Sequence, residues 1–270
     1  MRIVVCMKQV PDTSGKIAVN ENGTLNRASM QAIANPDDMC ALEAALQFKE
    51  LYGAHVCVMS MGPLSVKEML REMLARGADE AVLVSGREFG GSDTFATSQI
   101  LAAAIVEYGI DEETLVFCGR QAIDGDTAQV GPQIAEKLGI AQITYVCEMS
   151  MKENMLYCTR KVDDARIYVR AKLPCLVTCV KGMNEPRFMN VPDIMRACAS
   201  EITLYDYAKL ANNPLIEADT IGLKGSPTNI FKSFTLKQKD KQVQMINGSE
   251  CGCRQFVEDM MDKFVIRRGV

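Results

Sequence analysis

The chain has 270 residues, of which 48% are hydrophobic and 24% charged, and this usage suits a globular protein with one large domain and room for an appendage. The net charge of −4 and the isoelectric point near 5.3 exclude the basic footprint of a nucleic-acid-binding domain. There is no run of about 18 apolar residues, so the sequence predicts no membrane-spanning helix.

The cysteines and the histidine limit the chemistry of any site. Eleven scattered cysteines, an odd number, indicate free thiols in a reducing, cytoplasmic compartment, and the N-terminal stretch lacks the apolar region of a signal peptide. The closest pair, Cys251 and Cys253, has no second pair at zinc spacing. His55 is the only histidine, so a site with several histidine ligands is excluded. We predict no metal site and no catalytic side chain.

Strands and helices alternate over the first half of the chain. Apolar runs predict strands at 2–7, 54–62, 80–86 and 114–119. Helical periodicity predicts helices at 35–53, 65–77, 92–109 and 126–139. In the first helix, Asn35 is the expected cap, Pro36 suits the first turn and Gly53 ends it. Such βαβ units predict an α/β fold with a parallel sheet flanked by helices on both faces.

The second half of the chain has a different character. Four strand-like runs with short connections, at 143–151, 154–162, 165–173 and 174–180, predict antiparallel strands at an edge of the sheet. We divide the chain into an α/β domain at 1–205 and a C-terminal arm at 206–270. The arm ends in an expected amphipathic helix with Phe256, Met260 and Phe264 on one face, and this face packs either on the body or on a partner chain.

Ligands of open parallel sheets bind where the strands end, and the exit at 119–127, GRQAIDGDT, is the most unusual one. Gly62, Gly91 and Gly125 at three of the exits would allow a ligand close to the backbone, beside helix N-termini that attract phosphate. Asp124 and Asp126 suit backbone capping or ribose hydroxyls better than phosphate. The stretch therefore remains open between a capped turn, a nucleotide site and, ranked low, an acid/base pair.

A second unusual stretch, NEPRFMNVPDIM at 184–195, combines two prolines with apolar side chains and has no regular pattern. It is either a buried loop or a surface recognition loop.

Taken together, these stretches resemble the β subunit of electron-transferring flavoproteins. The matching segments are VCMKQVPD, NPDDMCALEAALQFKE, SMGP, ARGADEAVLV, GRQAIDGDTAQVGPQIAEKLG, KLPCLVT, NEPRF and VPDIM, and they span nearly the whole chain. The resemblance implies an adenine-nucleotide-binding, Rossmann-like fold with the nucleotide-binding domain at 1–205. It also implies a heterodimer with an FAD-carrying α subunit, and a nucleotide in this chain that is either FAD or a structural AMP. AIDGDTAQVGP followed by GLKGSPTNIFKSFT at 222–235 resembles the electron-bifurcating kind, which binds FAD. That kind takes electrons from NADH and divides them between an acyl-CoA dehydrogenase and a ferredoxin or flavodoxin.

The resemblance also implies the contact residues. The implied cofactor-binding residues are Cys6, Asn35, Asp38, Met61, Gly119, Arg120, Gln121, Ala122, Ile123, Asp124, Gly125, Asp126, Thr127, Gln129 and Val130. The implied contacts to the dehydrogenase are Val191, Pro192, Ile194 and Met195. Two alternatives remain, a non-bifurcating electron shuttle with AMP and a stand-alone adenine-nucleotide-binding module.

Overall fold

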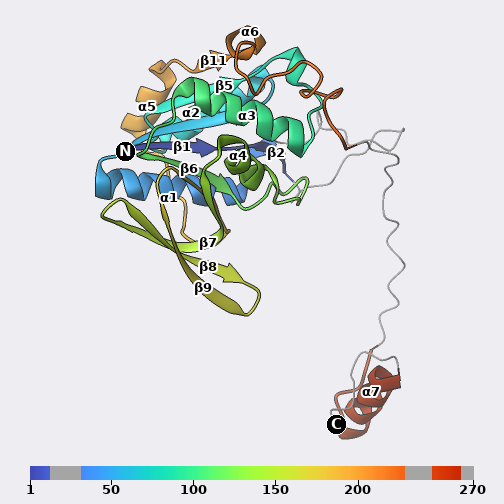
Figure 1. Ribbon diagram of the computed structural model, residues 1–270. Coiled ribbons are helices and arrows are strands. Elements are labelled where there is room, and N and C mark those ends of the chain that lie inside the picture. The colour runs from blue at the N-terminus through green and yellow to red at the C-terminus, as the bar shows by residue number, and fades with distance from the viewer. Residues whose placement is uncertain (13–31, 229–244, 263–270) are drawn as a thin grey trace. The chain divides into compact units, whose positions relative to one another are not determined.

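A computed structural model describes residues 1–12, 32–228 and 245–262 and divides the chain into two units, Met1–Lys232 and Ser233–Val270. The first unit contains a nine-stranded sheet with the order β11-β5-β4-β1-β6-β10-β7-β8-β9, and β2 pairs separately with β3 (Figure 1). Its strands are β1 (Arg2–Cys6), β2 (Gln9–Pro11), β3 (Ala32–Ala34), β4 (His55–Met61), β5 (Glu80–Val84), β6 (Thr114–Gly119), β7 (Ala141–Lys152), β8 (Met155–Val162), β9 (Ala165–Lys172), β10 (Cys175–Cys179) and β11 (Thr203–Tyr205). Its helices are α1 (Pro36–Tyr52), α2 (Lys67–Ala75), α3 (Thr94–Tyr108), α4 (Val130–Leu138), α5 (Val191–Ala199) and α6 (Tyr207–Leu210).

The predicted α/β fold is confirmed. All pairings from β11 through β7 are parallel, while β8 and β9 extend the sheet in antiparallel fashion. One detail of the prediction is wrong, because the run at 174–180 does not join the antiparallel edge. It forms β10, which inserts in parallel between β6 and β7. Every residue of β10 is buried, as expected for a strand covered on both faces.

Helices cover both faces of the sheet. Alternate residues of β1 point to opposite sides, and Ile3 and Val5 pack in the core under α1, α2 and α5. Val4 and Cys6 belong to the other core, under α3, α4 and α6. The loops that leave β1 and β6 therefore lead to opposite faces, the first to α1 and the second to α4.

Helix α1 starts and ends as the sequence predicts, but its cap works differently. Pro36 occupies the first turn, and Gly53 closes the helix in the left-handed region with φ 65°. Asn35 stands at the N-cap position without making a side-chain cap hydrogen bond. Its side chain is bound instead to the loop after β6, as described below.

The structure divides the chain later than the predicted boundary after Tyr205. Leu210, Ile216 and Ile221 are buried in the core under α3, so the segment that follows α6 belongs to the body. The second unit contains α7 (Glu250–Asp262), in which Phe256 and Val257 are exposed. Phe264, predicted on the same helical face, lies outside the described residues. In the described part of the chain, no helix is long and apolar enough to cross a membrane.

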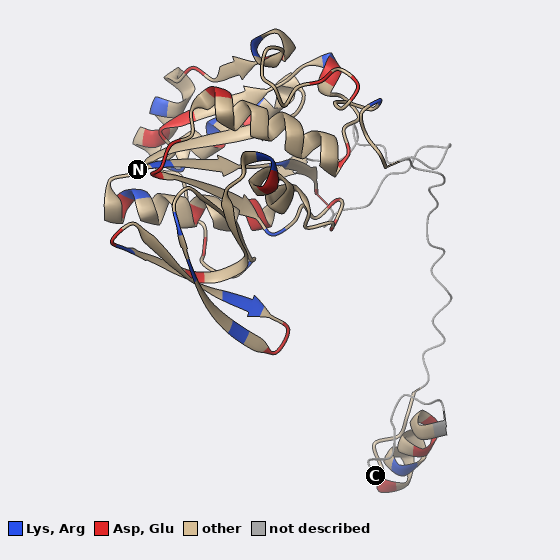
Figure 2. Cartoon of the chain, viewed as in Figure 1, with Lys and Arg blue, Asp and Glu red and all other residues tan. Residues whose placement is uncertain are grey.

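The charges of the body are mixed. Figure 2 shows Asp and Glu dispersed among Lys and Arg over the ribbon, with basic residues also present on β8 and β9.

Candidate functional site

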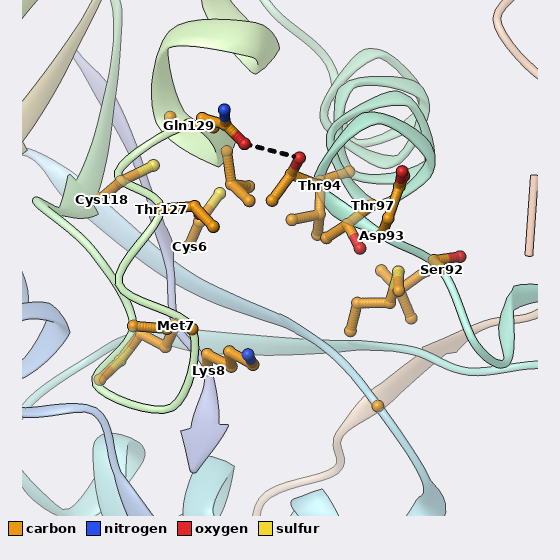
Figure 3. Close-up of a pocket in the computed structure, with 18 of the residues that line it drawn as sticks. Cys6, Met7, Lys8, Ser92, Asp93, Thr94, Thr97, Cys118, Thr127 and Gln129 are labelled. Carbon is orange, nitrogen blue, oxygen red and sulfur yellow. Dashed lines mark hydrogen bonds between the residues drawn. The ribbon is translucent and has the colours of Figure 1, made fainter. Parts of the chain in front are cut away.

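A cavity of about 590 Å³ opens where β1, β4, β5 and β6 end (Figure 3). It lies at the crossover between β1 and β6, whose following loops depart to opposite faces of the sheet. Open α/β sheets bind their ligands at such a crossover, and the volume is in the range of small-molecule sites.

The N-terminus of α1 is hydrogen-bonded to the residues at the ends of β1 and β6, beside this cavity. Asp38 accepts hydrogen bonds from the backbone amides of Lys8 (2.8 Å) and Gly119 (2.9 Å), one on each carboxylate oxygen. Gly119 is required here, because a Cβ at this position would clash with the Asp38 carboxylate and lie 2.6 Å from the Asp37 carbonyl carbon. Burial raises the pKa of Asp38 to about 7, while the two amides and the Asn35 side chain oppose that rise.

Asn35 binds the loop after β6 at two points. Its Nδ2 donates to the Gln121 carbonyl (2.8 Å), and its Oδ1 accepts from the Ile123 amide (3.2 Å). With 1% exposure, the side chain has both polar groups occupied by protein backbone. The side chain therefore fixes the shape of the loop, and the implied contact of Asn35 with a nucleotide stays a prediction.

Further polar contacts fix the loop from 119 to 129, one from Lys8 and one within the loop. Lys8 Nζ lies 2.8 Å from one Asp124 carboxylate oxygen and 2.9 Å from the other. Gln121 donates to Asp126 (2.7 Å), so this carboxylate stabilises the turn. The predicted helix start at Asp126 is wrong. Asp126 and Ala128 have positive φ angles of 51° and 53°, which interrupt a helix, and α4 begins at Val130.

The start of α3 forms the opposite wall of the cavity. Asp93 caps the helix by accepting from the Ala96 amide (3.1 Å) and also accepts from the Thr228 amide (2.9 Å). Desolvation acts against the charge of Asp93, but these amides outweigh it and hold its pKa below the usual value. Thr94 donates to Gln129 (3.0 Å), which connects this wall to the loop before α4 (Figure 3).

The glycines at the strand exits have different roles. A Cβ on Gly62 would lie 2.7 Å from Val66, and one on Gly91 would lie 2.9 Å from Leu223, so both glycines serve close packing. Gly125 also lines the cavity, but a Cβ on it would meet no atom within 4 Å. Of these three, Gly125 is the one beside open space that a ligand can use.

Most of the implied cofactor residues line the cavity: Cys6, Asp38, Met61, Gly119, Arg120, Gln121, Ala122, Gly125, Thr127, Gln129 and Val130. Asn35, Ile123, Asp124 and Asp126 do not, and each makes the loop contacts given above. The cavity is also lined by residues that the sequence does not predict as contacts: Met7, Lys8, Ser85, Gly86, Ser92, Asp93, Thr94 and Thr97. The segment that follows β5, residues 85–94, contains most of them and is the feature of the sequence that points to them.

Cationic side chains line the cavity, and the described residues form no metal-binding group. Arg120 lines the cavity, and its Nε lies 3.3 Å from Asp37. Burial raises the pKa of Asp37, with Arg120 opposing the rise. Within residues 1–12, 32–228 and 245–262, no group of three or more His, Cys, Asp or Glu is arranged to hold a metal ion.

Comparison with known proteins identifies the family. The electron transfer flavoprotein domain matches residues 22–210. The chain belongs to the electron transfer flavoprotein family.

The similarity of this flavoprotein subunit to named relatives extends over nearly the whole chain. It is 54% identical over 266 residues to acryloyl-CoA reductase electron transfer subunit gamma of Anaerotignum propionicum, which covers 98% of both chains. It is 48% identical over 239 residues to the electron transfer flavoprotein subunit beta of Clostridium acetobutylicum, covering 88% of this chain and 90% of that protein. It is 46% identical over 250 residues, 92% of this chain and 93% of the relative, to caffeyl-CoA reductase-Etf complex subunit CarD of Acetobacterium woodii. The predicted resemblance to β subunits is confirmed, and with it a β-subunit-like function in electron transfer.

The 184–195 segment of this flavoprotein subunit lies on the surface, which excludes the buried-loop alternative. Asn190 caps α5 by accepting from the Asp193 amide (2.9 Å), a helix start that the sequence reading missed. The exposed fractions are 93% for Phe188, 69% for Val191 and 70% for Met195. Pro192 and Ile194 are also exposed. We call this surface, Phe188–Met195, the α5 apolar surface.

Arg187 anchors the α5 apolar surface to α1. Its Nε and Nη2 donate to the two carboxylate oxygens of Glu43, both at 2.9 Å, and its backbone amide adds a third bond at 3.1 Å. Burial acts against the charge of Glu43, but the hydrogen bonds from Arg187 outweigh it and hold the Glu43 pKa below its usual value. Arg187 also pairs with the exposed Glu50.

Replacing Glu43 with glutamine should lower the free energy of unfolding by about 2 kcal/mol, because charge-assisted hydrogen bonds in a buried position are lost. Because the folded pKa of Glu43 is lowered, its contribution is present above the reference value of 4.5 and is lost as pH falls through the folded pKa. Urea unfolding at several pH values measures both effects. Glu50→Gln is the matched control, with an expected loss of about 0.5 kcal/mol. Equal losses in the two variants would contradict the anchoring role of Glu43.

Proposed function

We propose that this chain is the nucleotide-carrying β subunit of a heterodimeric electron transfer flavoprotein, and that the cavity holds the adenosine diphosphate half of FAD. The observation that carries the proposal is the open space beside Gly125, at the β1–β6 crossover. A pyrophosphate can lie against a backbone without a Cβ, where a side chain would intrude.

The residues of the cavity fit such a ligand. The N-terminus of α3 contributes its positive dipole end together with the hydroxyl groups of Ser92, Thr94 and Thr97. Arg120 adds a cation at the lining. Asp38 and Asn35 hold the loops in place and leave the phosphates to these donors.

When bound, FAD supplies a flavin ring that accepts a hydride and passes on single electrons, and the protein supplies position and electrostatics. The residues of this chain bind and orient the adenosine end and keep water from the lining. The ring environment belongs in part to the α subunit in this proposal.

We further propose the bifurcating type of electron transfer. Electrons from NADH would divide between an acyl-CoA dehydrogenase and a low-potential ferredoxin or flavodoxin. Two relatives support the acyl-CoA side, because their names refer to acryloyl-CoA reductase and caffeyl-CoA reductase. A structural AMP in a non-bifurcating shuttle is the alternative, and nucleotide analysis separates the two.

Exposed apolar side chains indicate where the two partner proteins would bind. The α5 apolar surface is the proposed contact to the dehydrogenase, since an exposed apolar cluster on a rigid anchor suits protein recognition. The exposed apolar residues of α7, Phe256 and Val257, are the proposed contact of the C-terminal arm to the α subunit.

Gly125→Asp should reduce FAD affinity by roughly tenfold or more, because a like charge is placed beside the pyrophosphate. Gly125→Asn has nearly the same size without the charge, so it isolates the electrostatic part of the loss. FAD content after gel filtration and a fluorescence titration measure the affinity of each heterodimer. Unchanged affinity in both variants would place the pyrophosphate elsewhere.

Val191→Ala should slow electron delivery to the dehydrogenase, because a central interface contact contributes about 1 kcal/mol or more. Flavin content and NADH-driven flavin reduction should stay at the wild-type level. Leu51→Ala removes an equally exposed apolar side chain (71% exposed) from α1 and should leave both rates unchanged. If Val191→Ala behaves like this control, the α5 apolar surface is not the docking site.

A further inference from the structure

Two cysteines meet at the base of the cavity. Cys6 is the last residue of β1, and Cys118 is its register partner on the parallel neighbour β6. Adjacent strands lie about 4.8 Å apart, so side chains at register partners on one face are close neighbours. Both thiols belong to the core on the α3 and α4 side, and both line the cavity.

The pair is sheltered but reachable from the cavity. Each cysteine retains 6% exposure, in contrast to the 0% of Cys57 and Cys175 in the same sheet. Figure 3 shows the sulfurs of Cys6 and Cys118 beside each other at the cavity lining. A hydrogen bond with Cys6 and burial raise the pKa of Cys118 well above its ordinary value, so this thiol stays protonated at neutral pH.

A protonated thiol reacts slowly with reagents that need one thiolate. A soft centre that carries a basic oxygen can take up the two thiol protons itself, and soft centres prefer sulfur ligands. No third cysteine, histidine or carboxylate completes a metal-binding group here within the described residues. The site therefore suits a ligand that needs only two adjacent sulfurs.

We propose that Cys6 and Cys118 form a dithiol site that takes a bidentate thiophilic ligand of the trivalent arsenic class at the base of the cavity. With an organic arsenoxide, two arsenic–sulfur bonds form and the arsenic–oxygen double bond breaks. The two thiol protons leave with the oxygen as water. Arsenic stays trivalent, so no oxidant or reductant is required. The inference does not rest on the identity of the nucleotide.

The test uses the reduced, full-length chain and phenylarsine oxide as the probe. Cys251→Ser with Cys253→Ser is the starting background, because this C-x-C pair is exposed and could take up the probe itself. Intact-mass titration should show tight uptake at a single site. Cys6→Ser and Cys118→Ser should each weaken it by about 100-fold, because a chelate is reduced to a single bond. Cys175→Ser, which removes another buried strand cysteine, should leave uptake unchanged.

Peptide mapping keeps the proposal testable if a serine variant fails to fold. After proteolysis of the arsenic-treated background protein, the fragments that contain Cys6 and Cys118 should be joined through arsenic. Fragments joined through any other pair of cysteines, or full uptake by a folded Cys6→Ser variant, would overturn the proposal.

Discussion

Replacing Gly119 with alanine should destabilise the body by about 3 kcal/mol and abolish nucleotide binding. An added Cβ would overlap the Asp38 carboxylate and approach the Asp38 amide to 2.6 Å. Most of the nearby atoms are backbone, so a side-chain rotation cannot relieve the clash. The N-terminus of α1 would have to move away from the end of β6, and the amide that Gly119 donates to Asp38 would be lost.

Gly125→Ala is the matched control for this prediction. Its new Cβ meets no protein atom within 4 Å, so the free energy of unfolding should change by less than about 0.5 kcal/mol. Urea unfolding of both variants without nucleotide measures the difference in stability, and FAD titration of Gly119→Ala against the wild type measures the loss of binding. If Gly119→Ala unfolds at the wild-type urea concentration, the close approach of α1 to β6 is not as described.

Replacing Asn35 with aspartate should produce a large and pH-dependent loss of stability. A carboxylate oxygen would replace the Nδ2 group that donates to Gln121 at 2.8 Å, so two acceptors would face each other in a buried position. The expected loss at pH 8 is about 3 kcal/mol, the scale of an unpaired buried charge. Burial and the neighbouring Asp37 and Asp38 should raise the pKa of the introduced carboxyl.

The sign of the pH dependence follows from that raised pKa. Between the unfolded pKa near 3.9 and the higher folded pKa, the native state binds more protons than the unfolded state. Stability and FAD affinity should therefore recover as pH falls, because the protonated carboxyl can donate to Gln121. Asn35→Ala also alters the surroundings of Asp38, but it should show no such recovery relative to wild type. If stability depends on pH in the same way in the two variants, Asn35 does not shape the loop as described.

The sequence predicts the parallel sheet well because strand and helix periods alternate clearly through residue 139. The sequence analysis misplaces β10, because a short apolar run has the same pattern in an edge hairpin as in a central strand. Only the pairing with β6 and β7 distinguishes the two positions. The start of α4 is missed for a local reason. Residues 126–139 have helical composition, but positive φ angles at Asp126 and Ala128 delay the helix to Val130.

The position of the site can be predicted from the sequence, but the role of each residue in it cannot. The exits of β4, β5 and β6 could be predicted from glycines and helix starts, and many of the implied residues line one cavity. The roles of Asn35 and Asp38 depend on hydrogen bonds to residues distant in the sequence, such as Gln121 and Gly119. A local sequence pattern does not reveal such contacts. The same holds for Thr228, whose amide reaches the cap residue Asp93.

The nucleotide content of the purified heterodimer tests the central proposal most directly. Heat release followed by chromatography separates FAD from AMP and counts each against protein. We expect FAD from both subunits and no AMP, and a lower FAD content of this subunit in Gly125→Asp. AMP in place of the second FAD would contradict it and would make this chain a structural-nucleotide subunit without a flavin of its own.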